Sequence, residues 1–263
     1  MKNKLRMMML STDKNADMWE LFISQLNICW PKLDIDVVIN TENRSDNSNT
    51  ISNLKKKYDI RLLTSEKKFS NEKWSKRVKH YLKEFPSNYW LFILDDYILD
   101  KPVDSNEVSK VIDWLDNDIS IVHVNFIKTK KYSIEKNGYT LVPRNEKYRL
   151  NLQIGIWRSA FLMRFLRNHE NPWQLETWGN IRAQRMRGTV YHSAGTKKVF
   201  HYKVGGVLKR GLWNGPDVKE KIVEWGFKDI LYSRSLYENG KTSLSFKRRT
   251  LLKKILDLFR SMI

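Results

Sequence analysis

The sequence is short of three things: cysteine, acidic residues and long hydrophobic runs. Cys29 is the only cysteine in 263 residues, so we expect it to pack as a small apolar side chain, as suits a reducing cytoplasm. No segment approaches the roughly 18 consecutive apolar residues that a membrane-spanning helix needs. Asp and Glu number 29 against 48 Lys and Arg, which leaves a charge of +19. This balance favours an anionic partner: a phosphorylated ligand, lipid headgroups or nucleic acid.

Several well-known functional motifs are also absent. There is no Gly-x-Ser-x-Gly sequence, so acyl transfer is not supported. The five histidines are scattered, and none pairs with a second His or Cys at the spacing of a structural zinc site. The Walker spacing of a P-loop is missing. No recognised DNA- or RNA-binding motif is present, and the aromatic residues lie within apolar runs rather than among basic residues, which makes a nucleic-acid partner unlikely.

The most informative feature present is an apolar run that ends in two adjacent acids. Tyr89 to Leu94 reads as a strand buried on both faces, and Asp95 and Asp96 follow it directly. Ligands of parallel sheets bind at the carboxyl ends of the strands. Two neighbouring carboxylates repel each other there, which favours a bound Mg²⁺ or Mn²⁺. The alternative is a turn in which the acids cap the next segment.

Strand and helix patterns alternate through the first half of the chain, which predicts an α/β fold with a largely parallel sheet. After the acid pair a helical pattern and another strand continue the series. Lys136-Asn137-Gly138 then predicts a β-hairpin, and Asn171-Pro172 with Gln174 predicts a capped helix. The predicted elements are Leu5–Leu10, Ala16–Cys29, Ile35–Ile39, Asp59–Leu63, Glu72–Phe85, Tyr89–Leu94, Val103–Asn117 and Ile119–Val124.

Taken together, the strand ending Leu94-Asp95-Asp96, the helix after it, the hairpin and the segment Asn171 to Glu176 resemble a GT-A-fold glycosyltransferase. Such enzymes occur in bacterial capsule, exopolysaccharide and lipopolysaccharide clusters. The resemblance covers roughly residues 5 to 215. It implies a GT-A-like single domain with a mostly parallel central sheet, a hairpin lobe on the acceptor side and amphipathic helices at the C-terminus. Members transfer a sugar from a nucleotide sugar, and a divalent metal bridges the diphosphate to the acidic motif.

The resemblance also assigns roles to individual residues. Asp96 corresponds to the direct metal ligand and Asp95 to a contact with the donor ribose or the metal. The family pattern has acids at its first and third positions, whereas here they are adjacent, so the division of labour stays open. Glu176 resembles the base that takes the proton of the acceptor hydroxyl. Trp173 and Asn180 share one predicted helical face with it and are expected to contact the acceptor; an acid early in a helix is also favoured by the helix dipole alone.

Further residues are candidates for binding the donor. Arg77 could hold a phosphate, although a solvated surface charge is the alternative. Lys209 and Arg210 belong to the glycine-rich segment 205–211, which could close over a diphosphate or form a plain hairpin turn. His201 could complete a metal shell, although a lone histidine is more often structural. Three others, Ser11, Asp13 and Thr41, lie just past the first two strands, where donor nucleotides rest in similar folds; each could equally be a cap or turn residue.

The chain is expected to divide into a catalytic domain at residues 1–215 and a helical C-terminal extension at residues 216–263. Residues 245–263 form a basic amphipathic pattern, which predicts an in-plane anchor on an anionic membrane surface. A helix docked on the protein's own core or on a second subunit is the alternative. The anchor would hold the protein on the inner face of the cell membrane, as a peripheral cytoplasmic protein.

The function expected from the sequence is therefore an inverting, metal-assisted glycosyltransferase. Its donor would be a nucleotide sugar, with a UDP-sugar expected first, and its acceptor a glycan or lipid-linked glycan of bacterial surface polysaccharide synthesis. Mn²⁺ or Mg²⁺ would be the cofactor. Two alternatives remain: a metal-dependent nucleotidyl or phosphoryl transferase that uses the same acids, and a non-enzymatic basic protein that binds nucleic acid.

Overall fold

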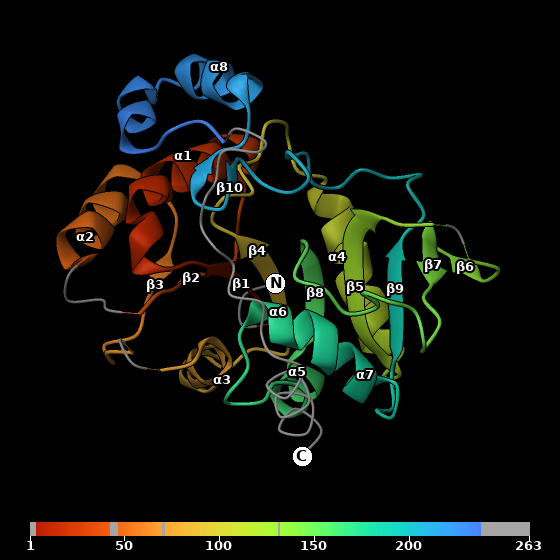
Figure 1. The fold of residues 1–263 in the computed structure, drawn as a ribbon. Coiled ribbons are helices and arrows are strands. Elements are labelled where there is room, and N and C mark those ends of the chain that lie inside the picture. Colours follow the sequence, from red (N-terminus) through yellow and green to blue (C-terminus); the bar gives the residue numbers. More distant parts are fainter. Residues whose placement is uncertain (1–3, 43–46, 70–71, 131, 238–263) are drawn as a thin grey trace.

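The computed structural model describes residues 4–42, 47–69, 72–130 and 132–237. Within them, nine strands form one sheet in the order β3-β2-β1-β4-β8-β5-β9-β7-β6, which runs from left to right in Figure 1. The strands are β1 Leu5–Leu10, β2 Val37–Asn40, β3 Leu62–Leu63, β4 Tyr89–Leu94, β5 Ile121–Lys128, β6 Glu135–Lys136, β7 Tyr139–Leu141, β8 Gly155–Arg158 and β9 Thr189–Ser193. The predicted basic helix at 245–263 lies outside the described residues.

The predicted α/β class with a mostly parallel sheet is confirmed. Strand β1 pairs in parallel with both β2 and β4, and β2 pairs in parallel with β3. Strand β8 lies antiparallel between β4 and β5, while β9 returns parallel to β5. No sequence pattern indicated β8. A side chain at Gly155 on this strand would meet the ring of His123 at 2.7 Å, which explains why a glycine stands where the two strands approach so closely.

Helices cover both faces of the sheet and give two apolar layers. Side chains of β1 at Met7 and Met9 face α1 and α4, and those at Met8 and Leu10 face α3 and α5. Alternate strand residues therefore enter opposite cores, as expected for a strand buried on both sides. The helices are α1 Trp19–Cys29, α2 Ser48–Lys57, α3 Trp74–Glu84, α4 Ser105–Asn117, α5 Ser159–Phe165, α6 Pro172–Gln174, α7 Asn180–Ala183 and α8 Pro216–Glu224.

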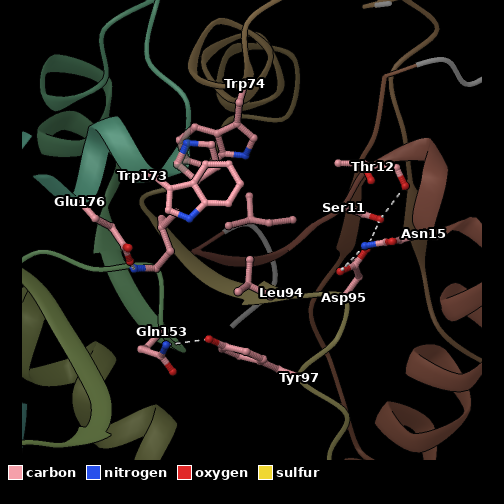
Figure 2. A pocket seen from close by; sticks show the side chains of 13 residues that line it. Ser11, Thr12, Asn15, Trp74, Leu94, Asp95, Tyr97, Gln153, Trp173 and Glu176 are labelled. Carbon is pink, nitrogen blue, oxygen red and sulfur yellow. Dashed lines mark hydrogen bonds between the residues drawn. The ribbon is translucent and has the colours of Figure 1, made fainter. Parts of the chain in front are cut away.

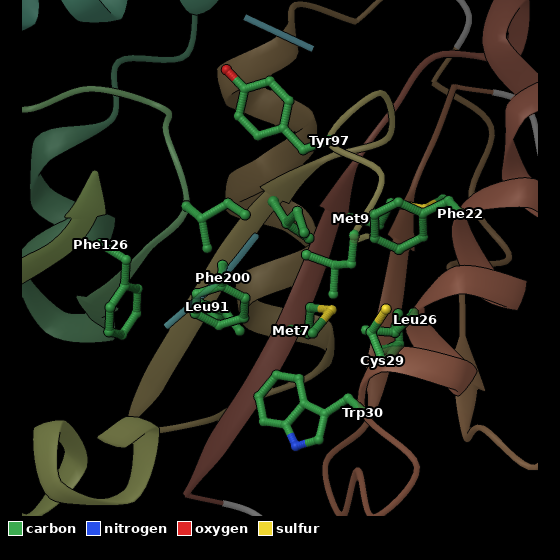
Figure 3. Close-up of a cluster of buried hydrophobic side chains, with 14 of the residues drawn as sticks. Met7, Met9, Phe22, Leu26, Cys29, Trp30, Leu91, Tyr97, Phe126 and Phe200 are labelled. Atoms are coloured by element: carbon green, nitrogen blue, oxygen red, sulfur yellow. The ribbon is translucent and has the colours of Figure 1, made fainter. Parts of the chain in front are cut away.

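The core beneath α1 is aromatic and sulfur-rich (Figure 3). Phe22, Leu26 and Cys29 of α1 pack against Met7 and Met9 of β1. Cys29 is buried and free, as its apolar flanks predicted. Burial of these side chains is what holds α1 on the sheet, because removing apolar surface from water is the main stabilising contribution to such packing.

Most predicted element boundaries lie within a few residues of the observed ones. The predicted strand Ile119–Val124 is β5 and continues to Lys128. Before α1, residues Asp13–Met18 form a 3₁₀ helix, η1, in which Asn15 leaves helical geometry at φ −106°. The hairpin prediction is confirmed, with Asn137 at φ 56° and Gly138 at φ 84° between β6 and β7. This hairpin pairs with β9 and so extends the central sheet.

Beyond β9 the chain forms a small second sheet, an α-helix and a short 3₁₀ helix. Strands β10 Leu208–Lys209 and β11 Leu212–Trp213 pair with each other, and η4 Lys228–Ser233 follows α8. Trp213 and the α8 residues Val218 and Ile222 are buried in the same core as β1 and α1. Among the described residues, no helix is both long and apolar enough to span a bilayer.

Candidate functional site

The three parallel strands β1, β2 and β4 end level with one another, so their carboxyl ends lie side by side. Leu10 of β1 lies opposite both Asn40 of β2 and Leu94 of β4. Polar groups that follow these strands therefore gather at the carboxyl ends of the strands, which is where ligands bind in open parallel sheets. The residues directly after the strands are Ser11, Thr41 and Asp95.

A cleft of about 310 Å³ opens at these strand ends. We call it the acidic cleft. Ser11, Asn15 and Asp95 line one side, and Trp173 and Glu176 line the other, as Figure 2 shows. The structure thus brings together four residues singled out in the sequence from segments more than 70 positions apart: Ser11, Asp95, Trp173 and Glu176.

Asp95 is held at the cleft wall by hydrogen bonds. Its side chain is buried, at 4% exposure. Ser11 donates to one carboxylate oxygen at 2.5 Å, Asn15 donates to the other at 3.4 Å, and Trp19 donates to the Ser11 hydroxyl at 2.7 Å. Burial raises the pKa of Asp95 to about 6, and the bonds from Ser11 and Asn15 oppose part of that rise.

Asp96 lies beneath the glycine-rich segment 205–211. Its backbone oxygen accepts the N–H of Val207 at 2.9 Å. Gly206 approaches so closely that an added Cβ would stand 2.0 Å from Asp96 Oδ2. Burial, reinforced by the charge of Asp95, raises the pKa of Asp96 to about 7. The glycine-rich segment is therefore built against the acid pair, and a residue with a side chain at position 206 would push it away.

Adjacent carboxylates such as Asp95 and Asp96 are the type of ligand that a hard divalent cation takes. Within the described residues neither Asp95 nor Asp96 has a Lys or Arg ion pair, and no group of three or more His, Cys, Asp or Glu side chains gathers to hold a metal. Mg²⁺ is commonly held by one or two carboxylates, with substrate phosphates and water as its other ligands. The donor set thus suits a cation that binds together with a phosphorylated ligand.

The raised pKa of Asp96 predicts a pH-dependent effect of Asp96→Asn on stability. A carboxyl whose pKa is higher in the folded than in the unfolded state lowers stability progressively as the pH rises from its unfolded to its folded pKa, and the penalty is complete above the folded pKa. In EDTA at pH 8 we therefore expect the variant to gain stability over the wild type, by up to roughly 4 kcal/mol for about three pKa units. The gain should shrink through pH 7 and vanish near pH 4.

Urea unfolding of both proteins at several pH values measures this difference directly. The comparison with the wild type matters because buried His123 and His192, whose pKa values are lowered by burial, give both proteins a separate acid sensitivity. A difference in unfolding free energy that stays constant from pH 8 to pH 4 would contradict the placement of Asp96 in a desolvated, negatively charged site.

Glu176 stands on the opposite wall, on an unusual turn of helix. The predicted capping box at Asn171 and Gln174 is confirmed and begins α6. A π-helical turn, η3 Leu175–Gly179, follows and carries Glu176; such turns occur frequently at functional sites. One carboxylate oxygen, Oε1, accepts the backbone N–H of Leu152 at 2.8 Å. Burial raises the pKa of Glu176, and the Leu152 bond opposes that shift.

The π-helical turn separates the other two residues of the predicted acceptor face. Trp173 lines the cleft and is 75% exposed. Asn180 does not line it: its amide donates to the carbonyls of Leu150 and Glu176, and its oxygen accepts the N–H of Leu150. Asn180 therefore anchors the loop that supports Glu176, and the structure does not bring it to the place beside the acceptor that α-helical spacing predicted.

Several residues of the cleft and its surroundings were not predicted from the sequence. Trp74, the first residue of α3, lies beside Trp173, and Gln153 donates to the Tyr97 hydroxyl at 2.6 Å in the wall of the cleft. Arg234 does not line the cleft, but it ion-pairs with Asp17 and donates to Asn15, so it secures the segment beside Asp95. Nothing in their local sequence distinguishes these residues, because each reaches the site through a long-range contact.

Three predicted donor-binding residues form a network behind the cleft. The hydroxyl of Thr41 donates to the carboxylate of Asp13. Arg77 is only 2% exposed and is not the solvated charge that we weighed as its alternative. Its guanidinium donates to Asn40, Glu42 and the backbone oxygen of Ser11. None of the three lines the cleft; they hold the ends of β1 and β2 in register.

The remaining predicted residues lie further from the acidic cleft. Lys209 and Arg210 sit at the β10–β11 turn, where both cations lie over the ring of Tyr237. The backbone oxygen of His201 accepts from Asp100, and the charges that act on its ring are those of Lys198, Lys101 and Asp100. Within the described residues, the structure does not gather His201 with the two aspartates.

Comparison with known proteins shows the fold. No protein-family model and no curated protein sequence matches this chain. Residues 1–349 of S. aureus TarS match over 98% of this chain and 81% of that one, at 12% identity and a TM-score of 0.52. The same fragment in complex with UDP-GlcNAc matches over 98% and 79%, at 15% identity and TM-score 0.46.

A cytidylyltransferase from Leptospira borgpetersenii also matches, over 90% of this chain and 99% of that one, at 12% identity and a TM-score of 0.46. Another crystal structure of TarS also matches, and this chain covers 36% of the length of that protein. The likeness to the TarS fragment with a TM-score of 0.52 establishes a shared α/β architecture around a large central sheet.

Proposed function

We propose that this protein is an inverting glycosyltransferase that moves a sugar from a nucleoside diphosphate to an acceptor hydroxyl. The observation that carries the proposal is the arrangement of the acidic cleft. Asp95 lines one wall and Glu176, a carboxylate whose pKa is raised by burial, lines the other, with Trp74 and Trp173 beside it. An inverting transfer needs a base on the face of the sugar opposite the leaving group. With a carboxylate on each wall, the leaving group can lie on the Asp95 side and the base can be Glu176 on the other.

The donor nucleotide is assigned to the Asp95 side. Ser11 and Asn15 stand there at the carboxyl end of β1, where this class of sheet binds its ligands. The TarS fragment that shares this fold has been solved in complex with UDP and with UDP-GlcNAc. A UDP-sugar is therefore the first donor to test.

Mn²⁺ or Mg²⁺ would be held by Asp96 and Asp95, and the nearest basic influence on Asp95 is the charge of Arg234, which itself ion-pairs with Asp17. When bound, such a cation stabilises the negative charge that develops on a leaving diphosphate. The protein's own contribution on this side is to fix Asp95 through Ser11 and Asn15 and to place the backbone of Gly206 against Asp96.

Glu176 would take the proton of the acceptor hydroxyl. Its Oε1 is oriented by the N–H of Leu152, and among the described residues no donor bonds to Oε2, which leaves that oxygen to face the acceptor. The raised pKa brings this carboxylate closer to neutral pH and makes it a stronger base. Exposed Trp173 offers a flat surface on which a sugar ring can stack.

Thermal unfolding with a panel of nucleotide sugars and Mn²⁺ tests the donor site. We expect the matching donor, at about 100 times its dissociation constant, to add about 2.7 kcal/mol to stability. The Asp96→Ala variant should lose this metal-dependent shift. Asp229→Ala, which removes an exposed carboxylate from η4, should keep it.

Product analysis then separates the reaction classes. Release of nucleoside diphosphate from the donor with transfer of the sugar supports the proposal. Release of pyrophosphate would instead assign the acid pair to nucleotidyl transfer. Oligonucleotide binding that weakens with salt, without turnover of any nucleotide sugar, would indicate that the protein's positive charge serves to bind nucleic acid, and it would overturn the enzyme proposal.

A further inference from the structure

A second cavity lies beyond the acidic cleft and surrounds a buried arginine. It has a volume of about 260 Å³ and is lined by Tyr132, Leu141, Arg144, Arg149, Gly188 and Thr189, among others. We call it the arginine pocket. It shares no lining residue with the acidic cleft, and none of its residues belongs to the proposed donor or base machinery.

Arg149 is an unusual residue to find at a pocket wall. It is 2% exposed, and its Nη2 donates to the backbone oxygen of Gly188 at 2.8 Å. Its Nε is buried and has no hydrogen-bond partner. In the described parts of the chain no carboxylate forms an ion pair with it, and the charged side chain that acts on it is another cation, Arg144. Burying a guanidinium without a counter-charge is costly.

The charge of Arg149 is nevertheless retained and its position is fixed. Burial lowers the pKa of Arg149 to about 10, which still leaves it protonated at neutral pH. Its backbone N–H donates to the backbone oxygen of Glu146, and its own backbone oxygen lies 2.8 Å from Nε2 of buried His192 on β9. These bonds fix the backbone of Arg149, and the bond from Nη2 to Gly188 orients its guanidinium before any ligand arrives, which lowers the entropy lost on binding.

We propose that the arginine pocket binds an anionic group, a phosphate or a carboxylate, with Arg149 as its principal contact. The guanidinium of Arg149 supplies charge-assisted hydrogen bonds, and planar guanidinium groups match the oxygens of both anions. Arg144, an exposed residue that lines the same cavity, adds a second positive charge. The bound anion supplies the counter-charge that the folded chain lacks at this position.

A third hollow shares lining residues with both the arginine pocket and the acidic cleft. Tyr132 lines both the arginine pocket and a cavity of about 300 Å³ whose other lining residues include Gln153 and Glu176. The anion has two sources: a free ion, or a charged group on a larger acceptor that extends from Glu176. The second source rests on the proposed function, whereas anion binding itself does not.

Titration with inorganic phosphate at constant ionic strength, in the absence of any nucleotide sugar, tests the proposal. Arginine Nε–H signals in ¹H–¹⁵N spectra report on the site, because the guanidinium of Arg149 changes its electronic environment when the anion binds beside it. We expect one such signal to shift saturably. Arg149→Lys should remove that signal, and Arg149→Gln should weaken phosphate binding by at least about tenfold.

Arg144→Ala tests the same pocket without disturbing a buried group, since its side chain is exposed. It should weaken phosphate binding severalfold, whereas Arg185→Ala, which removes an exposed arginine outside the pocket, should not. Glucose 1-phosphate distinguishes the sources: tighter binding than inorganic phosphate indicates a phosphorylated sugar ligand, and equal binding indicates a free anion. If no Nε–H signal shifts saturably, or if Arg144→Ala and Arg185→Ala behave alike, the proposal is wrong.

Discussion

Replacing Glu176 by Gln is expected to lower sugar transfer by about a hundredfold to ten-thousandfold while leaving donor binding unchanged. The amide keeps an oxygen that can accept the N–H of Leu152, so the loop at the cleft floor stays in place. It cannot take a proton from the acceptor hydroxyl. The measurement is single-turnover transfer from a saturating nucleotide sugar, together with the donor-induced thermal shift of the same preparation.

Glu220→Gln is the matched control, because Glu220 is an exposed carboxylate on α8, away from the acidic cleft. It should transfer sugar at the wild-type rate. The wild type should also lose activity as the pH falls through the raised pKa of Glu176, and Glu176→Gln should lack this contribution and keep only the acidic limb that Asp95 and Asp96 produce. Transfer by Glu176→Gln within tenfold of the wild type would place the base elsewhere in the cleft.

The second large effect is expected at Gly206, where the glycine-rich segment touches Asp96. In Gly206→Ala the new Cβ would stand 2.0 Å from Asp96 Oδ2 and 2.6 Å from its Cγ, so the segment or the carboxylate must move. Because a displacement of about 1 Å in a catalytic site can cost about a hundredfold in rate, we expect a loss of that size in transfer. Donor binding should weaken with it.

Gly205 provides a nearly ideal control for this variant. Both glycines have positive φ, +85° at Gly205 and +78° at Gly206, so an alanine carries similar backbone strain at either position, roughly 1 to 2 kcal/mol. A Cβ at Gly205, however, meets nothing within 4 Å. Gly205→Ala should therefore lose stability but keep most of its activity. Equal losses of transfer in the two variants would mean that contact with Asp96 does not matter to the reaction.

Much of the local structure was predictable because it depends on short-range patterns. The apolar run from Tyr89 to Leu94 is the buried strand β4, and the two aspartates follow it as expected. Asn137-Gly138 forms the hairpin turn, since both residues tolerate positive φ. The capping box at Asn171 begins a helix as predicted. In each case the residues that determine the structure are neighbours in the chain.

The role of Arg77 shows where such reasoning stops. From the sequence it was weighed as a phosphate ligand or a solvated charge, yet it lies buried against Asn40 and Glu42, about 35 positions away. Likewise, Asn180 does not lie on the predicted helical face, because the chain adopts a π-helical turn after Gln174. Neither outcome has a local signal, since both depend on partners supplied by other segments.

The sequence by itself determined the α/β class, the strand that ends in Asp95 and Asp96, and the turns that need Asn or Gly. Only the tertiary structure decided that β8 enters between β4 and β5, that Glu176 faces Asp95 across one cleft, and that Arg149 is buried without a carboxylate partner. Periodicity and turn chemistry act over a few residues and can be read directly. Strand order and side-chain partners depend on contacts between distant segments, and these form only when the whole core packs.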